Sequence, residues 1–240
     1  MKLWVFGDSY SIDHYKSPGV SNWQPIDKSW VDLTSDYLRA DETTITAQPG
    51  VSNSWIYQEV LKVIESFTSN DLVIIQLTSK TREWLIERHP ALSNWQGLYD
   101  FKDTDITKDE ELALKYYQRY LYNHNTINLH YDMLVRALMF IAKNTESKML
   151  FLPGFDPLPG CTGTLGDICY GEFDESINHS IYYKHHYHDP RVNHMHEVNH
   201  KILASKICNF FQNHECVNLL TGFERGFINM NNYKEIKQIA

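Results

Sequence analysis

Short apolar runs bounded by turn residues recur along the chain and predict buried strands. Such runs occupy residues 3–6, 72–77 and 148–152, and a weaker β-branched run occupies residues 43–46. An uninterrupted run of this length is typical of a parallel strand, because helices cover both faces of a parallel sheet. The pattern therefore predicts a mainly parallel sheet built on these strands.

Between these runs, apolar residues repeat at the spacing of an amphipathic helix. The periodic segments are residues 30–38, 55–64, 127–142 and 194–211, and a further helix is expected near residues 110–122. Helices of this kind bury one face against a sheet or against another helix. Strands that alternate with helices predict a three-layer α/β/α domain with right-handed crossovers.

Two segments interrupt this alternation. Residues 89–125 are polar and aromatic and resemble an insertion, whereas residues 153–190 form a long loop rich in glycine, proline and histidine. Long loops within compact domains are often functional. We expect one domain that spans residues 1–240 and carries these two additions.

Composition narrows the possible partners and the compartment. The formal net charge is −8, which argues against a nucleic-acid partner because phosphate backbones require a basic surface. No apolar stretch has the length of a membrane span, and no signal peptide precedes the first strand, so a cytoplasmic location is expected. The four cysteines are too few for a disulfide-built scaffold of this size.

The turn after the first predicted strand carries candidate chemistry. It reads Gly7-Asp8-Ser9-Tyr10-Ser11, and the chain leaves the sheet there at the carboxyl end of the strand, where parallel sheets bind ligands. Ser9 is a candidate nucleophile whose neighbouring backbone N–H groups can hold an oxyanion. The alternative interpretation is that Asp8 and Ser9 cap the following helix.

A serine nucleophile needs a base, and the C-terminal region is rich in histidine. Seven of the twelve histidines fall between His179 and His200. His194 lies at the predicted start of the last helix and Asp189 lies upstream of it. A histidine at this position can be a base, or it can cap or pack against the helix.

In this order, the Gly7-Asp8-Ser9 turn and the C-terminal aspartate and histidine resemble the SGNH or GDSL hydrolases. That family has a flavodoxin-like α/β/α fold and cleaves esters of lipids, acylated sugars and related compounds through a Ser-His-Asp arrangement without a metal or another cofactor. The resemblance implies that Ser9 is the nucleophile, His194 the base and Asp189 the acid of a catalytic triad. His200 falls on a later histidine that is usually structural.

The resemblance also implies an oxyanion hole. The backbone N–H of Ser9 is one expected donor, and that of Gly50, in the second block Gln48-Pro49-Gly50-Val51-Ser52-Asn53, is another. The third block of the family normally supplies an asparagine side chain, but Thr78 occupies that position here. The Thr78 hydroxyl, or the amide of Asn53, can take the place of that asparagine.

The C-terminal block departs from the family pattern as well. The family places its acid three residues before the base, and that position holds Arg191 in this chain. Asp189 is the nearest acid, so it is the expected partner of His194.

Substrate contacts are less well defined by the sequence. Asp8, Tyr10 and Arg82 are candidates, because Asp8 and Tyr10 flank Ser9 and Arg82 follows the third block. A ring platform for sugars or a place in the core are alternative interpretations for Trp23, Trp30, Trp84, Trp95 and Tyr99. The expected substrate is a carbohydrate or another small compound that bears a short acyl group, such as acetyl.

Two other classes of function remain open. One is a metal-binding protein, with candidate ligands at His185, His186, His188, Asp189, His194 and His196. The other is a non-catalytic domain that binds a carbohydrate or a partner on the same fold. A chelator separates the first class from an ester hydrolase, and covalent labelling of Ser9 separates the second.

Overall fold

The computed structural model describes residues 1–12, 28–85, 107–168, 195 and 197–223. The chain divides into two compact units. The first unit consists of Met1–Ile12 and Asp41–Leu158, and the second of Asp13–Ala40 and Pro159–Ala240.

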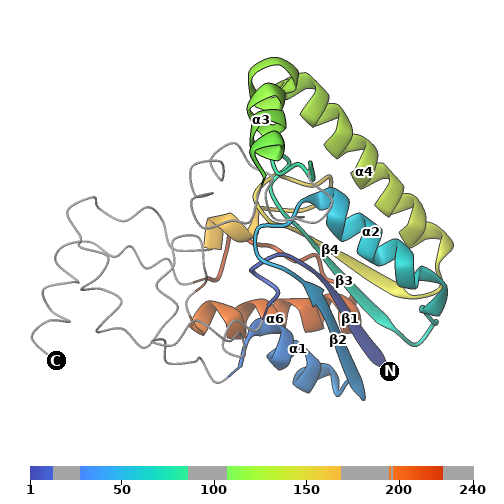
Figure 1. The fold of residues 1–240 in the computed structure, drawn as a ribbon. Coiled ribbons are helices and arrows are strands. Elements are labelled where there is room, and N and C mark those ends of the chain that lie inside the picture. The colour runs from blue at the N-terminus through green and yellow to red at the C-terminus, as the bar shows by residue number, and fades with distance from the viewer. Residues whose placement is uncertain (13–27, 86–106, 169–194, 196, 224–240) are drawn as a thin grey trace, which may run out of the picture. The chain divides into compact units, whose positions relative to one another are not determined.

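The first unit is built on a parallel sheet of four strands (Figure 1). The strands are β1 (Lys2–Gly7), β2 (Glu42–Ala47), β3 (Leu72–Leu77) and β4 (Lys148–Pro153). Their order in the sheet is β2-β1-β3-β4, and every neighbouring pair is parallel. This order is that of doubly wound, flavodoxin-like sheets, in which the strand order reverses beside β1. The predicted α/β class and parallel sheet are confirmed.

Burial along the strands explains why some were easier to predict than others. All six residues of β3 are buried, and so are the last five of β1, because both strands lie inside the sheet. No residue of β2 is fully buried, because it is the last strand at one side of the described sheet. The sequence signal of β2 was therefore weaker than that of the central strands.

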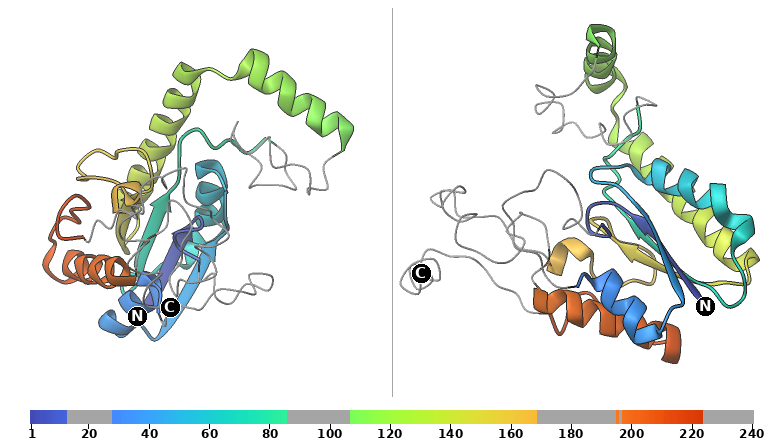
Figure 2. Two further views of the ribbon diagram at one scale, coloured as in Figure 1. Left: turned by 90° about the vertical axis from the view of Figure 1, so that its left-hand side faces the viewer. Right: turned by 60° about the horizontal axis from the view of Figure 1, so that its bottom comes forward.

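Two helices of the first unit pack together on the sheet. Helix α2 (Asn53–Val63) contacts β1, β3 and α4 (His124–Asn144), as two views of the ribbon show (Figure 2). Its side chains Ile56 and Val60 are fully buried. A short 3₁₀ turn, η2 (Ile64–Ser66), follows α2.

The predicted helix near residues 110–122 is present but changes type part of the way along. Helix α3 (Lys108–Tyr116) begins with a capping box between Thr107 and Glu110. It continues into a π-helical turn, η5 (Tyr117–Leu121), a rare element that is often found at functional sites. The part of the predicted insertion from residue 89 to residue 106 lies outside the described residues.

The second unit contains two helices that pack against each other. They are α1 (Trp30–Leu38), which is capped by Ser29, and α6 (Glu197–Asn213); a 3₁₀ turn, η6 (Leu165–Ile168), accompanies them. Trp30 is fully buried and belongs to the core, which was one of its two interpretations. The third layer of the predicted fold stays a prediction.

No cysteine among the described residues forms a disulfide. Cys161, Cys208 and Cys216 are all free thiols. Cys208 is buried on α6, and this burial raises the pKa of its thiol to about 11.

Candidate active site

The candidate site lies where β1 and β3 end, at the reversal of strand order. The turn after β1 closes through the Ser11 N–H, which donates to the Asp8 carbonyl at 3.0 Å. The Tyr10 N–H donates to the Asp8 carboxylate, also at 3.0 Å. Ser9 is half-buried within this turn. The first described helix after it, α1, is capped by Ser29, so the alternative role of Asp8 and Ser9 as its caps is not observed.

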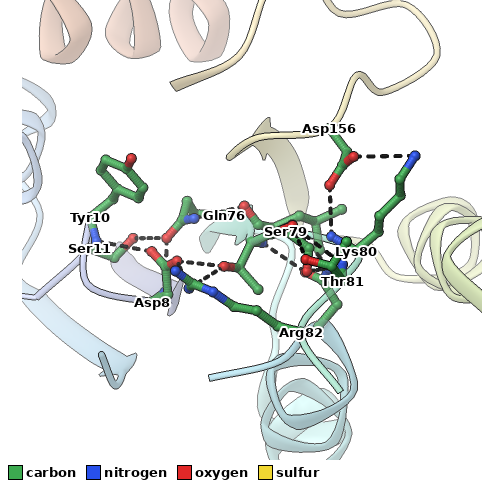
Figure 3. Close-up of polar contacts among 12 residues, drawn as sticks. Asp8, Tyr10, Ser11, Gln76, Ser79, Lys80, Thr81, Arg82 and Asp156 are labelled. Atoms are coloured by element: carbon green, nitrogen blue, oxygen red, sulfur yellow. Dashed lines mark hydrogen bonds and ion pairs between the residues drawn. The ribbon is translucent and has the colours of Figure 1, made fainter. Parts of the chain in front are cut away.

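Asp8 is fully buried and is held by two side chains from the segment after β3 (Figure 3). Its Oδ2 accepts hydrogen bonds from the Thr78 hydroxyl and from the Arg82 guanidinium, each at 2.6 Å. The same guanidinium nitrogen also donates to the Thr78 hydroxyl at 2.5 Å. Two of the predicted substrate contacts, Asp8 and Arg82, are therefore partners of each other in an ion pair.

Gln76 joins the same network from within β3. Its side-chain oxygen accepts from the Asp8 N–H at 2.8 Å and from the Ser11 hydroxyl at 3.1 Å. Its amide nitrogen donates to the Leu77 carbonyl at 2.7 Å. Gln76 was not predicted from the sequence, although a fully buried glutamine within an apolar strand is a signal that a specific partner exists.

Two glycines leave room for this arrangement. A Cβ atom at Gly7 would lie 2.4 Å from the Gln76 side-chain oxygen, and a Cβ atom at Gly154 would lie 2.1 Å from the Leu77 carbonyl oxygen. Both distances are far below van der Waals contact, so no larger residue fits at either position.

The two side chains that were predicted to complete the oxyanion hole have other partners in the structure. The Asn53 amide pairs with the backbone of Thr78 in both directions: its nitrogen donates to the carbonyl at 3.0 Å and its oxygen accepts from the N–H at 2.8 Å. The Thr78 hydroxyl donates to Asp8. Both donors are thus engaged within the protein, and the structure brings these residues to the site as supports of the β3 end.

Gly50 lies in the loop that connects β2 with α2. It adopts a φ of 74°, in the left-handed region that favours glycine. The Gln48 N–H in the same loop donates to the Gly7 carbonyl at 3.3 Å, which ties the loop to the end of β1. Ser52 then caps α2 by accepting from the Trp55 N–H at 3.2 Å. The roles of the Ser9 and Gly50 N–H groups as oxyanion donors stay predictions.

The loop after β4 adds an aromatic side chain that was not predicted from the sequence. The Phe155 ring lies 5.5 Å from the Tyr10 ring, and the Arg82 guanidinium carbon lies 5.5 Å from the centroid of the Phe155 ring. In the next position, Asp156 accepts from the Lys80 N–H at 2.7 Å and pairs with its ammonium group at 3.4 Å. These contacts join the ends of β1, β3 and β4 (Figure 3).

A half-buried acid follows Arg82 directly. Burial raises the pKa of Glu83 above its ordinary value, and the positive charge of His130 opposes this shift. Burial, and in second place the Glu83 carboxylate, raise the pKa values of Tyr117 and Tyr122. Glu83 therefore lies in a partly desolvated environment beside η5 and α4.

The remaining predicted residues lie outside the described part of the chain. They include the predicted base His194, its expected acid Asp189, and His185, His186, His188 and His196 of the metal-binding alternative. Within the described ranges, no group of three or more histidine, cysteine, aspartate or glutamate side chains is suited to hold a metal ion. His200 is described: it is buried in the second unit, and its Nδ1 accepts from the Trp30 N–H at 3.0 Å, which is a structural role.

Comparison with known proteins adds no assignment. No family model matches the chain, and no curated protein matches it in sequence. Of the helices in the described ranges, none combines the length and the hydropathy that a membrane crossing requires.

Proposed function

We propose that this protein is a serine ester hydrolase with Ser9 as its nucleophile. The observation that carries the proposal is the position of the Gly7-Asp8-Ser9 turn, which leaves β1 beside the reversal of strand order. Ligands of doubly wound sheets bind at that position. The left-handed Gly50 in the loop after β2, and the resemblance of both chain ends to the SGNH hydrolases, also support the proposal.

The proposed reaction is acyl transfer through a covalent intermediate. His194 takes the proton of the Ser9 hydroxyl while the serine oxygen attacks the ester carbonyl carbon. The N–H groups of Ser9 and Gly50 donate to the oxyanion, and Asp189 orients the imidazole. The C–O bond to the alcohol then breaks and His194 gives the proton to the leaving oxygen. Water, deprotonated by His194, hydrolyses the acyl-serine and Ser9 regains its proton.

We expect the substrate to be a short acyl ester of a carbohydrate or of another small compound. The proposal needs no metal and no organic cofactor, because serine, histidine and backbone donors suffice for acyl transfer.

Hydrolysis of p-nitrophenyl acetate and of acetylated sugars tests this proposal. Ser9→Ala and His194→Ala should each lower kcat by roughly 10³-fold or more, because nucleophile and base act as a unit. Ser54→Ala and His124→Ala are matched controls at exposed positions of α2 and α4, and they should retain activity. Equal turnover by all five proteins would exclude Ser9 and His194 from the reaction.

Covalent labelling identifies the nucleophile directly. A fluorophosphonate should modify the wild type on the peptide that contains Ser9, as mass spectrometry can show, and should leave Ser9→Ala unmodified. A folded wild-type protein that is neither labelled nor active would instead favour the non-catalytic binding domain.

A further inference from the structure

The residue before the proposed nucleophile places a negative charge inside the site. Asp8 is fully buried, and Ser9 follows it directly. Ester hydrolysis develops a second negative charge beside Ser9 in the transition state. Two like charges in a poorly solvated region repel each other strongly, so an uncompensated Asp8 would oppose the reaction.

Arg82 supplies the compensating charge. Its guanidinium nitrogen lies 2.6 Å from the Asp8 carboxylate, and the Arg82 side chain is only 16% exposed, so water screens this ion pair weakly. Thr78 donates to the same carboxylate oxygen, which adds a hydrogen bond but no charge. Phe155 stacks near the guanidinium and helps to shield it.

We infer that Arg82 is a positioning residue for ester hydrolysis: it acts through Asp8, whose charge it neutralises so that the oxyanion can form beside Ser9. This inference rests on the proposed function. It gives Arg82 a role that differs from direct contact with substrate, the role that the sequence suggested.

The inference predicts an asymmetry that a purely structural ion pair would not show. Removing the cation leaves a buried negative charge next to the oxyanion, whereas removing the carboxylate leaves a positive charge there. The first change should slow the chemical step and the second should not. If the pair merely held the turn in place, loss of either partner should be harmful to a similar degree.

Steady-state kinetics on four variants test this asymmetry. Arg82→Met should lower kcat by roughly 10- to 100-fold, with KM changed by less than about twofold, because the charge acts on the transition state and not on substrate binding. Asp8→Asn keeps the shape and the acceptor for the Tyr10 N–H, and should stay within about threefold of the wild type. The double variant Asp8→Asn/Arg82→Met should recover most of the lost kcat. Arg82→Lys, which keeps the charge but not the planar fork, should retain most activity.

Lys80→Met is the matched control. It removes a cation from the same segment and breaks the ion pair with Asp156, which lies after β4 and not beside Ser9. Its kcat should stay close to that of the wild type.

Three outcomes would overturn the inference. They are an Asp8→Asn enzyme as slow as Arg82→Met, a double variant that does not recover, and an Arg82→Lys enzyme as slow as Arg82→Met. Circular dichroism verifies that each variant folds, and if Arg82→Met does not fold, Asp8→Asn and Arg82→Lys decide the question. A wild-type protein without turnover or labelling would refute the hydrolase proposal itself, a result that the wild type alone reveals.

Discussion

Gly7 is the residue with the least room for change in the described site. We expect Gly7→Ala to lower the free energy of unfolding by about 3 kcal/mol, because the new methyl group would overlap the Gln76 side-chain oxygen and the Ser11 hydroxyl, at 2.4 and 2.5 Å. The same displacement would move the turn that carries Ser9, so labelling by a fluorophosphonate should slow as well. Urea unfolding and labelling rates measure the two effects.

Gly160→Ala separates crowding from backbone strain. Gly160 has a φ of 80°, and no atom lies within 4 Å of the position that an added methyl group would occupy, so its substitution should cost only about 1 kcal/mol and leave labelling unchanged. A Gly7→Ala protein as stable as the wild type would contradict the close packing around Gln76.

Glu83 gives a pH-dependent prediction. Because burial raises its pKa in the folded state, ionisation of Glu83 costs stability, and this cost appears as the pH rises through the ordinary range of a glutamate. Glu83→Gln should therefore melt at the same temperature as the wild type near about pH 4 and at a higher temperature near about pH 7. Thermal unfolding followed by circular dichroism at both values measures the difference.

The exposed Glu215 provides the comparison, since its carboxylate is solvated in the folded protein as well. Glu215→Gln should show no difference that grows with pH. A Glu83→Gln protein that is less stable than the wild type near neutral pH would show that the carboxylate has a stabilising partner.

Among the elements, α2 holds the end of β3 through its first residue. Asn53→Ala would leave the N–H and carbonyl of Thr78 buried without the partner that they have now. We expect a loss of about 2–4 kcal/mol in the free energy of unfolding, because unsatisfied buried polar groups are costly. Urea unfolding measures this loss, and Ser54→Ala, one position along and exposed, should change stability by less than about 0.5 kcal/mol. Equal midpoints for the two variants would contradict this role of Asn53.

At the scale of elements, the sequence predicted positions well and helix type less well. The strand at residues 72–77 has the predicted bounds, because six consecutive apolar residues require burial on both faces. The predicted helix at residues 127–142 is longer in the structure, His124–Asn144, because its ends are polar and carry no apolar period. The π-helical turn η5 was not predicted, since no local apolar pattern distinguishes it from an α-helix.

At the scale of the whole molecule, the hydrolase proposal makes a prediction about metals. Dialysis against EDTA should leave the hydrolysis of p-nitrophenyl acetate unchanged, because the proposed chemistry needs only protein groups. The histidines near the C-terminus are the reason for the experiment, since imidazoles are common ligands of Zn²⁺. A loss of activity that added Zn²⁺ or Ni²⁺ restores would favour the metal-binding alternative.

Local pattern by itself determined the strands, most helix positions and the turn that carries Ser9. These features depend on neighbouring residues, because burial and turn formation are expressed within a few positions of the chain. The fully buried Trp30 of α1 is another example, since its helical spacing already indicated a place in the core.

Only the tertiary structure decided what surrounds that turn. The partners of Asp8 are Gln76, Thr78 and Arg82, which lie 68, 70 and 74 residues away in the chain. They meet because β1 and β3 are neighbours in the sheet although β2 lies between them in sequence. Strand order depends on the packing of the whole sheet and leaves no local pattern, so the sequence suggested Arg82 as a substrate contact and the fold paired it with Asp8.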